Sequence, residues 1–288
     1  MSAQKLPIGV QSFQSLRESG YLYVDKTPYI EQLLRGKVYF LSRPRRFGKS
    51  LFLSTLAAYF RGQKELFKGL YLEKAEEELA QQEGREAWQE YTVLYLDLNT
   101  EYYRSEKDLD NILNIHLTAW EELYGKNEIE QTHSSRFKGI IERAYKKEQR
   151  EVVILVDEYD KPLYETLDNE VLNATYRGIL KGVFSVIKSS DEYLRFAFLT
   201  GITKFSKVSV FSGLNNLEDL SMTTNMRASV ELPSKNWKPI FPPIFVFWRR
   251  RKSFRMMKRK SSSRKITTAI VLPQRAKRFT THLVSSIF

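Results

Sequence analysis

Three consecutive residues, Gly48, Lys49 and Ser50, have the types and the order that bind a phosphate chain. They follow a short apolar run, 38–41, and precede a strongly apolar helical pattern, 51–60. The N–H groups of such a loop and the positive end of the helix dipole favour a bound triphosphate. We expect Lys49 to reach the outer phosphates and the Ser50 hydroxyl to ligate Mg²⁺. The predicted nucleotide-binding residues are Arg45, Arg46, Phe47, Gly48, Lys49, Ser50 and Leu51.

The loop departs from the common phosphate-loop pattern at its first position. That pattern, G-x-x-x-x-G-K-[ST], has a glycine where this chain has Arg43, and the glycine gives the turn its conformational freedom. Here Pro44 fixes one backbone angle, and Arg45 and Arg46 add positive charge. Because a Gly-Lys-Ser triplet is common by chance, the alternative for this stretch alone is a basic turn before an amphipathic helix.

Two adjacent acids, Asp157 and Glu158, follow five consecutive apolar residues, 152–156. Such a run is typical of a strand that is buried on both faces of a parallel sheet. In a phosphate-loop NTPase, Asp157 would hold the Mg²⁺ water shell and Glu158 would polarise the attacking water. A strand that ends in a polar turn is the alternative, and the earlier Gly-Lys-Ser favours the nucleotide site.

A third polar residue, Thr200, lies at the end of another predicted buried strand, 194–201. At that position a threonine can sense the terminal phosphate, although threonines also end strands without such a role. A further apolar strand, 91–98, separates the phosphate loop from the acidic pair, which suggests the NTPase subclass with an intervening strand. Alternating strands and helices predict an α/β fold, with a mainly parallel sheet flanked by helices and ligands at the carboxyl ends of the strands. The longest helices are expected near 106–124, 134–147 and 170–188.

Composition bounds the chemistry further. The chain of 288 residues has no cysteine, which excludes disulfides and thiolate metal sites. Its three histidines are far apart in the sequence, so a histidine-based metal site is not expected. The N-terminus lacks the apolar core of a signal peptide, and no apolar run reaches the length of a membrane span. We therefore expect a cytoplasmic protein without a membrane partner.

Charge is distributed unevenly along the chain. Residues 226–288 contain 16 Lys and Arg and one acid, Glu231, which leaves 30 bases and 33 acids in residues 1–225. The predicted body, 1–225, therefore carries about −3 and the predicted tail, 226–288, about +15. One interpretation is a tail that binds nucleic acid nonspecifically through its phosphates. The favoured one is a poorly ordered tail translated out of the original reading frame.

Five ordered stretches together resemble the AAA-ATPase-like family of uncharacterised bacterial proteins, and the resemblance covers residues 5 to about 222. The loop of that family also contains Arg-Pro-Arg-Arg, so the resemblance makes Arg43 a family trait. It implies ATP and Mg²⁺ as ligands, with Lys49, Ser50, Asp157 and Glu158 as matching site residues. The stretches are IGVQSF (8–13), YVDKT (23–27), SRPRRFGKSLF (42–52), LVDEYDKP (155–162) and LTGITKFS (199–206).

The resemblance also frames what is expected of the rest of the chain. Members of the family usually continue into a PD-(D/E)xK nuclease-like domain, which needs acidic metal ligands that residues 226–288 cannot supply. We therefore expect a truncated member without that domain. Asp25 and Lys26, in the second stretch, could lie near the nucleotide base or form a structural turn.

The predicted function is ATP binding and Mg²⁺-dependent ATP hydrolysis, with Lys49, Glu158 and Thr200 as catalytic residues and Ser50 and Asp157 as metal ligands. ATP is favoured over GTP by the resemblance, since the sequence contains no guanine-reading Asn-Lys-x-Asp. The alternative is a nucleotide-gated binding module that does not hydrolyse ATP, or a nucleic-acid binder acting through the tail. An arginine finger could come from Arg177, from Arg195 or from a partner subunit in a homo-oligomer.

Overall fold

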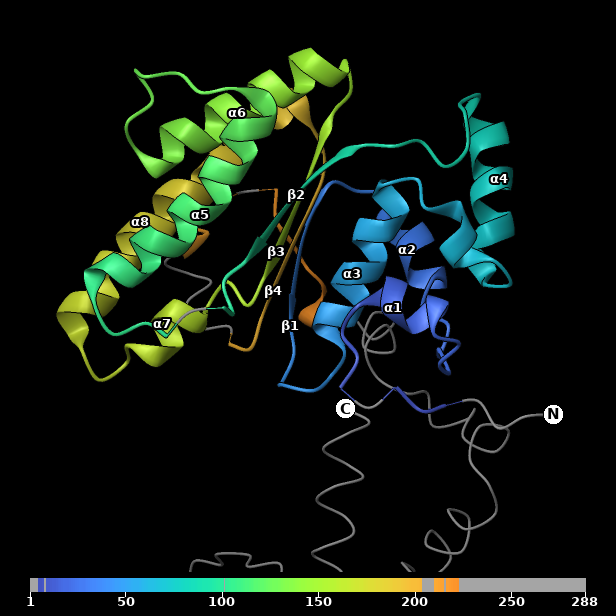
Figure 1. The fold of residues 1–288 in the computed structure, drawn as a ribbon, viewed down its shortest axis with the longest axis horizontal. Helices are drawn as coiled ribbons and strands as arrows, with labels where there is room; N and C mark the ends of the chain where they lie inside the picture. Colours follow the sequence, from blue (N-terminus) through green and yellow to red (C-terminus); the bar gives the residue numbers. More distant parts are fainter. Residues whose placement is uncertain (1–4, 8, 101, 204–209, 215, 223–288) are drawn as a thin grey trace, which may run out of the picture.

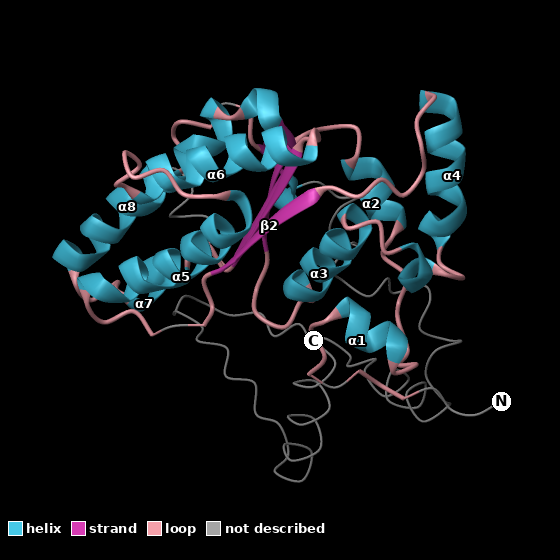
Figure 2. Cartoon of the chain, turned by 45° about the horizontal axis from the view of Figure 1, so that its top comes forward, coloured by secondary structure: helices cyan, strands magenta, loops and turns pink. Residues whose placement is uncertain are grey.

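A parallel sheet of five strands, in the order β2-β3-β4-β1-β5, forms the centre of the protein (Figures 1 and 2). This computed structural model describes residues 5–7, 9–100, 102–203, 210–214 and 216–222. The predicted tail, 226–288, lies outside the described residues. The predicted α/β class with a parallel sheet is confirmed. The strands are β1 (Val38–Ser42), β2 (Thr92–Asp97), β3 (Val152–Asp157), β4 (Leu194–Gly201) and β5 (Glu218–Asp219).

The helices cover both faces of this sheet. On one side lie α1 to α4, and on the other lie α5 to α8 (Figure 1). No helix within the described ranges is long and apolar enough to cross a membrane. The helices are α1 (Phe13–Glu18), α2 (Pro28–Leu33), α3 (Lys49–Phe60), α4 (Tyr71–Glu83), α5 (Glu106–Tyr124), α6 (His133–Glu148), α7 (Lys161–Glu165) and α8 (Glu170–Ser189). Short 3-10 turns are η1 (Lys64–Phe67), η2 (Asp191–Tyr193) and η3 (Leu220–Met222).

The central strands are apolar on both faces, because each face is covered by helices. In β3, Val153 and Leu155 pack into the core beneath α3, whereas Ile154 and Val156 pack into the core beneath α5, α6 and α8. Side chains alternate between the two faces along a strand, so Asp157 lies on the α3 face. The alternation brings the polar ends of the strands to the side where α3 begins.

The strand order decides which strand ends are neighbours. β4 comes after β3 in the chain but pairs with both β3 and β1, so it lies between them in the sheet. Leu41 of β1 is the register partner of Thr200 in β4, and Asp97 of β2 is the partner of Asp157 in β3. The sequence order of the strands suggested that β2 is the intervening strand, but in space the strand between the phosphate loop and the acidic pair is β4.

The turn at 25–27 has a structural role that the sequence left open. Thr27 precedes α2, and Pro28 is the first residue of that helix. The Thr27 hydroxyl does not cap α2 but accepts a hydrogen bond from the N–H of Leu72. The Asp25 carboxylate accepts from the N–H groups of Thr27 (2.8 Å) and Tyr71 (2.7 Å) and from the Thr27 hydroxyl (2.7 Å). The turn therefore satisfies the first N–H groups of α4.

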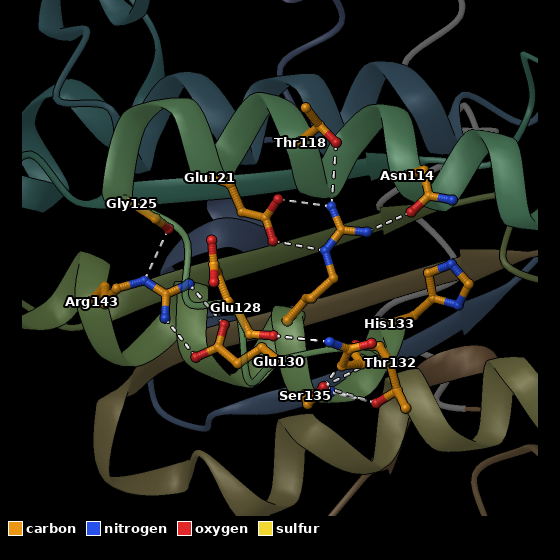
Figure 3. A network of polar contacts seen from close by, with 12 residues as sticks. Asn114, Thr118, Glu121, Gly125, Glu128, Glu130, Thr132, His133, Ser135 and Arg143 are labelled. Atoms are coloured by element: carbon orange, nitrogen blue, oxygen red, sulfur yellow. Dashed lines mark hydrogen bonds and ion pairs between the residues drawn. The ribbon is translucent and has the colours of Figure 1, made fainter.

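An ion-pair network joins α5 to α6 on the far side of the sheet from α3 (Figure 3). The Arg136 guanidinium donates to both oxygens of Glu121, at 2.7 and 2.8 Å, and to Asn114. Nearby, Arg143 donates to both oxygens of Glu130. Only 6% of the Glu121 side chain and 14% of the Arg136 side chain are exposed, so these two charges depend on one another.

We predict that Arg136→Met lowers the free energy of unfolding by about 3 kcal/mol at pH 7, because it leaves the Glu121 carboxylate buried without its partner. Arg136 holds the pKa of Glu121 below its usual value of 4.5. The contribution of the pair is therefore present above pH 4.5 and is lost as pH falls through the lower, folded-state pKa. Urea unfolding at several pH values measures the difference between variant and wild type.

The control is Lys64→Met, which removes an exposed ion pair with Glu77 and should have a far smaller effect. A loss of stability in Arg136→Met that is the same at pH 7 and at pH 3 would contradict this account of the network.

Candidate functional site

The loop between β1 and α3 has a backbone that suits a bound anion. Gly48 adopts a left-handed conformation (φ 76°) immediately before Lys49, the first residue of α3. A residue without a Cβ adopts that conformation readily, which makes Gly48 the one position here that requires glycine. Arg46 is also left-handed (φ 68°), which is uncommon for a residue with a side chain. The loop places the N-terminal N–H groups of a helix of 12 residues at the carboxyl edge of the sheet.

A buried ion pair links the two predicted halves of the site. The Lys49 ammonium lies 3.4 Å from a carboxylate oxygen of Glu158, and 3% and 13% of the two side chains are exposed. The same ammonium donates to the carbonyl of Pro44 at 3.4 Å. Burial raises the pKa of Glu158; Lys49 lowers it, and Asp157 and Asp160 raise it further. The structure thus brings Lys49 and Glu158 to the same edge of the sheet, as the sequence predicts.

Asp157 and Thr200 lie side by side next to this pair. The Thr200 hydroxyl donates to a carboxylate oxygen of Asp157 at 2.5 Å, and both residues are buried. Glu158, the next residue after Asp157, has a left-handed backbone (φ 52°). The predicted site residues of β3 and β4 therefore share one row at the sheet edge, with Thr200 orienting Asp157.

Sequence reasoning missed Asp97, a further member of this row, and Tyr95, which lies two residues earlier on the same face of the sheet. Both lie on β2, and Asp97 is the register partner of Asp157. The pKa of Asp97 is raised, mainly because the carboxyl group is buried. The nearby Asp157 carboxylate raises it further, and the hydrogen bond from the N–H of Asn99 opposes this shift. Burial against the Asp157 and Asp97 carboxylates also raises the pKa of Tyr95. A signal was present in the sequence, because Asp97 follows an apolar run just as Asp157 does.

The remaining predicted loop residues differ in exposure. Arg45 and Arg46 are exposed, and the Arg45 guanidinium lies 5.6 Å from the centre of the Tyr164 ring. Gly48 is also exposed, while Phe47, Ser50 and Leu51 are half-buried. The exposed arginines at the loop leave positive charge at the mouth of the site, where an anionic ligand would enter.

The two arginine-finger candidates lie in different places. Arg195 is the second residue of β4, at the amino end of the strand, five residues before Thr200. At about 3.3 Å per residue this is about 16 Å from the phosphate edge, so Arg195 cannot act there within its own chain. Arg177 lies on α8 and donates to the Asn173 side chain at 2.6 Å. Arg195 is therefore excluded as an arginine finger for its own chain, and Arg177 stays a candidate.

The donor set fits Mg²⁺ only together with a phosphate. In the part of the chain that the structure describes, no group of three or more His, Cys, Asp and Glu side chains could hold a metal ion. Mg²⁺ commonly takes one or two protein oxygens, several waters and phosphate oxygens. Ser50, in the first turn of α3, and Asp157 supply oxygens of that kind. They are suited to hold Mg²⁺ that arrives with a nucleotide.

The chain is similar to one protein family and to a curated relative. The family model described as "Predicted AAA-ATPase" matches residues 7–211, which is more than half of the chain. A curated protein of Azotobacter chroococcum mcd 1, described as an uncharacterized protein in the vnfD 5' region, is 42% identical over 246 residues. That match covers 84% of this chain and 46% of the relative, so the chain spans less than half of the length of the relative. No solved structure matches.

Arg43, the residue in place of the usual glycine, has a structural role of its own. Its side chain is buried, and its guanidinium donates to the carbonyls of Ser42 and Ser221 at 2.9 Å each. The Ser221 hydroxyl also accepts from the N–H of Ser42 at 2.8 Å. Arg43 thus connects the start of the phosphate loop to η3, next to the edge strand β5.

We predict that Arg43→Gly, which restores the common phosphate-loop pattern, lowers the free energy of unfolding by about 2 kcal/mol, because it removes buried hydrogen bonds and leaves a cavity. The matched control is Arg46→Gly. It should change stability by less than about 1 kcal/mol, since glycine relieves the left-handed backbone there while loosening the unfolded chain. Urea unfolding measures both. Equal effects at the two positions would show that Arg43 is not an anchor.

Proposed function

Because the chain belongs to the predicted AAA-ATPase family, we propose that it binds ATP and hydrolyses it with Mg²⁺. The observation that carries the proposal is the buried contact between Lys49, at the start of α3, and Glu158, at the end of β3. One of these groups suits the phosphates and the other suits the attacking water, and the fold holds them 3.4 Å apart. Bound Mg·ATP would supply the reactive phosphate and the charge that stabilises its transfer.

Each residue then has a definite task. Lys49 would exchange the Glu158 carboxylate for phosphate oxygens, assisted by the N–H groups of the loop and by the first turn of α3. The Glu158 carboxylate, freed from this ion pair, would accept a hydrogen bond from the attacking water and polarise it. Ser50 and Asp157 would hold the metal, and Thr200 would keep Asp157 in place through its 2.5 Å hydrogen bond. The raised pKa of Glu158 makes it a stronger base once it is ionised.

We predict that Lys49→Ala weakens Mg·ATP binding by about 100-fold or more, because it removes charge-assisted contacts to the phosphates and leaves Glu158 to repel them. Isothermal titration with Mg·ATP measures the affinity. The control is Lys64→Ala, which changes an exposed lysine beyond the end of α3 and should bind normally. Normal affinity in Lys49→Ala would remove this loop from the proposed nucleotide site.

We predict that Glu158→Gln lowers the turnover number by about 100-fold or more while binding is retained, because the amide keeps the shape of the side chain but cannot act as a base. Removing a negative charge beside the phosphates should leave affinity equal or higher. Steady-state phosphate release and titration, with Glu77→Gln as an exposed control, separate the two quantities. Unchanged turnover would take Glu158 out of the mechanism. Wild-type binding without turnover would favour a nucleotide-gated binding module instead.

A further inference from the structure

A second acid in the turn after β3, Asp160, is almost fully buried, with 1% of the residue exposed. Its carboxylate accepts hydrogen bonds from the N–H of Ile202 at 3.0 and 3.1 Å. It also accepts from the N–H of Thr203 at 2.6 Å and from the Thr203 hydroxyl at 2.7 Å. The acid two residues after Glu158 therefore binds the chain that leaves β4 immediately after Thr200.

Tyr159, between the two acids, makes the same connection. Its N–H donates to the carbonyl of Thr200 at 2.9 Å, and its hydroxyl donates to the carbonyl of Thr203 at 3.1 Å. Gly201 allows this close approach, because a Cβ there would lie 2.4 Å from the Tyr159 ring and 2.7 Å from an oxygen of Asp160. The side chains of the turn after β3 thus pack directly on the backbone at the end of β4, and position 201 has no room for a residue larger than glycine.

These contacts hold Glu158 in a conformation that it would seldom adopt alone. Its φ of 52° is uncommon for a residue with a Cβ and persists where surrounding contacts determine it. The carbonyl of Glu158 accepts from the N–H of Lys161 at 3.0 Å, which closes the turn. Tyr159 and Asp160, inside that turn, are both bound to the end of β4. The direction of the Glu158 side chain therefore depends on contacts with β4.

We propose that Asp160 is a positioning residue for hydrolysis, which fixes the turn of Glu158 to the strand end that carries Thr200. The inference rests on the proposed function, since it assigns Glu158 to the attacking water. The turn after β3 and the end of β4 would both contact the nucleotide at this edge. The Asp160 contacts join them, so that they move as one unit. A displacement of about 1 Å in a group that aligns a nucleophile can cost about 100-fold in rate, so the rigidity of this turn matters for turnover and little for binding.

The chain offers a matched control in Asp25. Its carboxylate also accepts from two backbone N–H groups and one threonine hydroxyl, at 2.7 to 2.8 Å. Those partners belong to the turn before α2 and to the start of α4, which carry none of the residues assigned to the site. Replacing Asp25 or Asp160 by Asn removes the same kind of acceptor and places an NH₂ group against N–H donors.

The experiment measures kcat and the affinity for Mg·ATP in Asp160→Asn and Asp25→Asn, at a temperature where thermal melts show both to be folded. We expect kcat to fall about 10-fold or more in Asp160→Asn, with the affinity within about twofold of wild type. Asp25→Asn should keep the wild-type kcat. Thr203→Val removes the 2.7 Å hydroxyl contact, keeps the N–H contact and should give a smaller loss of kcat, so it tests the same connection if Asp160→Asn does not fold.

A double-mutant cycle tests whether Asp160 acts through Glu158. If it does, adding Asp160→Asn to Glu158→Gln should reduce the residual turnover no further, because the residue to be positioned can no longer act as a base. Wild-type turnover in both Asp160→Asn and Thr203→Val, equal losses in Asp25→Asn and Asp160→Asn, or additive losses in the cycle would overturn the inference while leaving the ATPase proposal intact. A wild-type protein that binds Mg·ATP without turnover would overturn the proposed hydrolysis itself.

Discussion

The ion pair between Lys49 and Glu158 is the contact on which the rest of the site depends. Two opposite charges are buried together, and each would be strongly unfavourable there without the other. The pair exists because α3 begins close to the end of β3. This requires β1 and β3 to run in the same direction with only β4 between them. In the proposed function this pair is replaceable, since phosphate oxygens would take over Lys49 and release Glu158.

Parallel strands explain why so many polar groups gather at this edge. The carboxyl ends of β2, β3 and β4 lie next to one another, and alternation puts Asp97, Asp157 and Thr200 on the face covered by α3. Asp157 is thus bounded by a hydroxyl on one side and by a carboxylate on the other. Burial of this row lowers the local dielectric response, which strengthens its hydrogen bonds and makes each unpaired charge more costly.

Similar contacts build both the scaffold and the site. Asp25 with Thr27 satisfies the start of α4, and Asp160 with Thr203 ties the turn after β3 to the end of β4. Arg43 connects the start of the phosphate loop to η3. In each case a charged side chain binds backbone groups at an element end, where regular hydrogen bonding stops. The loops that form the site are held by such side chains and not by the sheet alone.

Local patterns in the sequence determined the elements and the candidate residues of the site. Apolar runs marked β3 and β4, and Gly48, Lys49 and Ser50 after an apolar run marked the loop, because period and residue type are visible without a fold. Only the tertiary structure decided which strand ends meet: β4 lies between β1 and β3, Asp97 lies beside Asp157, and Asp160 binds the chain that leaves β4. Strand order and register depend on contacts between residues far apart in the chain, so no local pattern contains them.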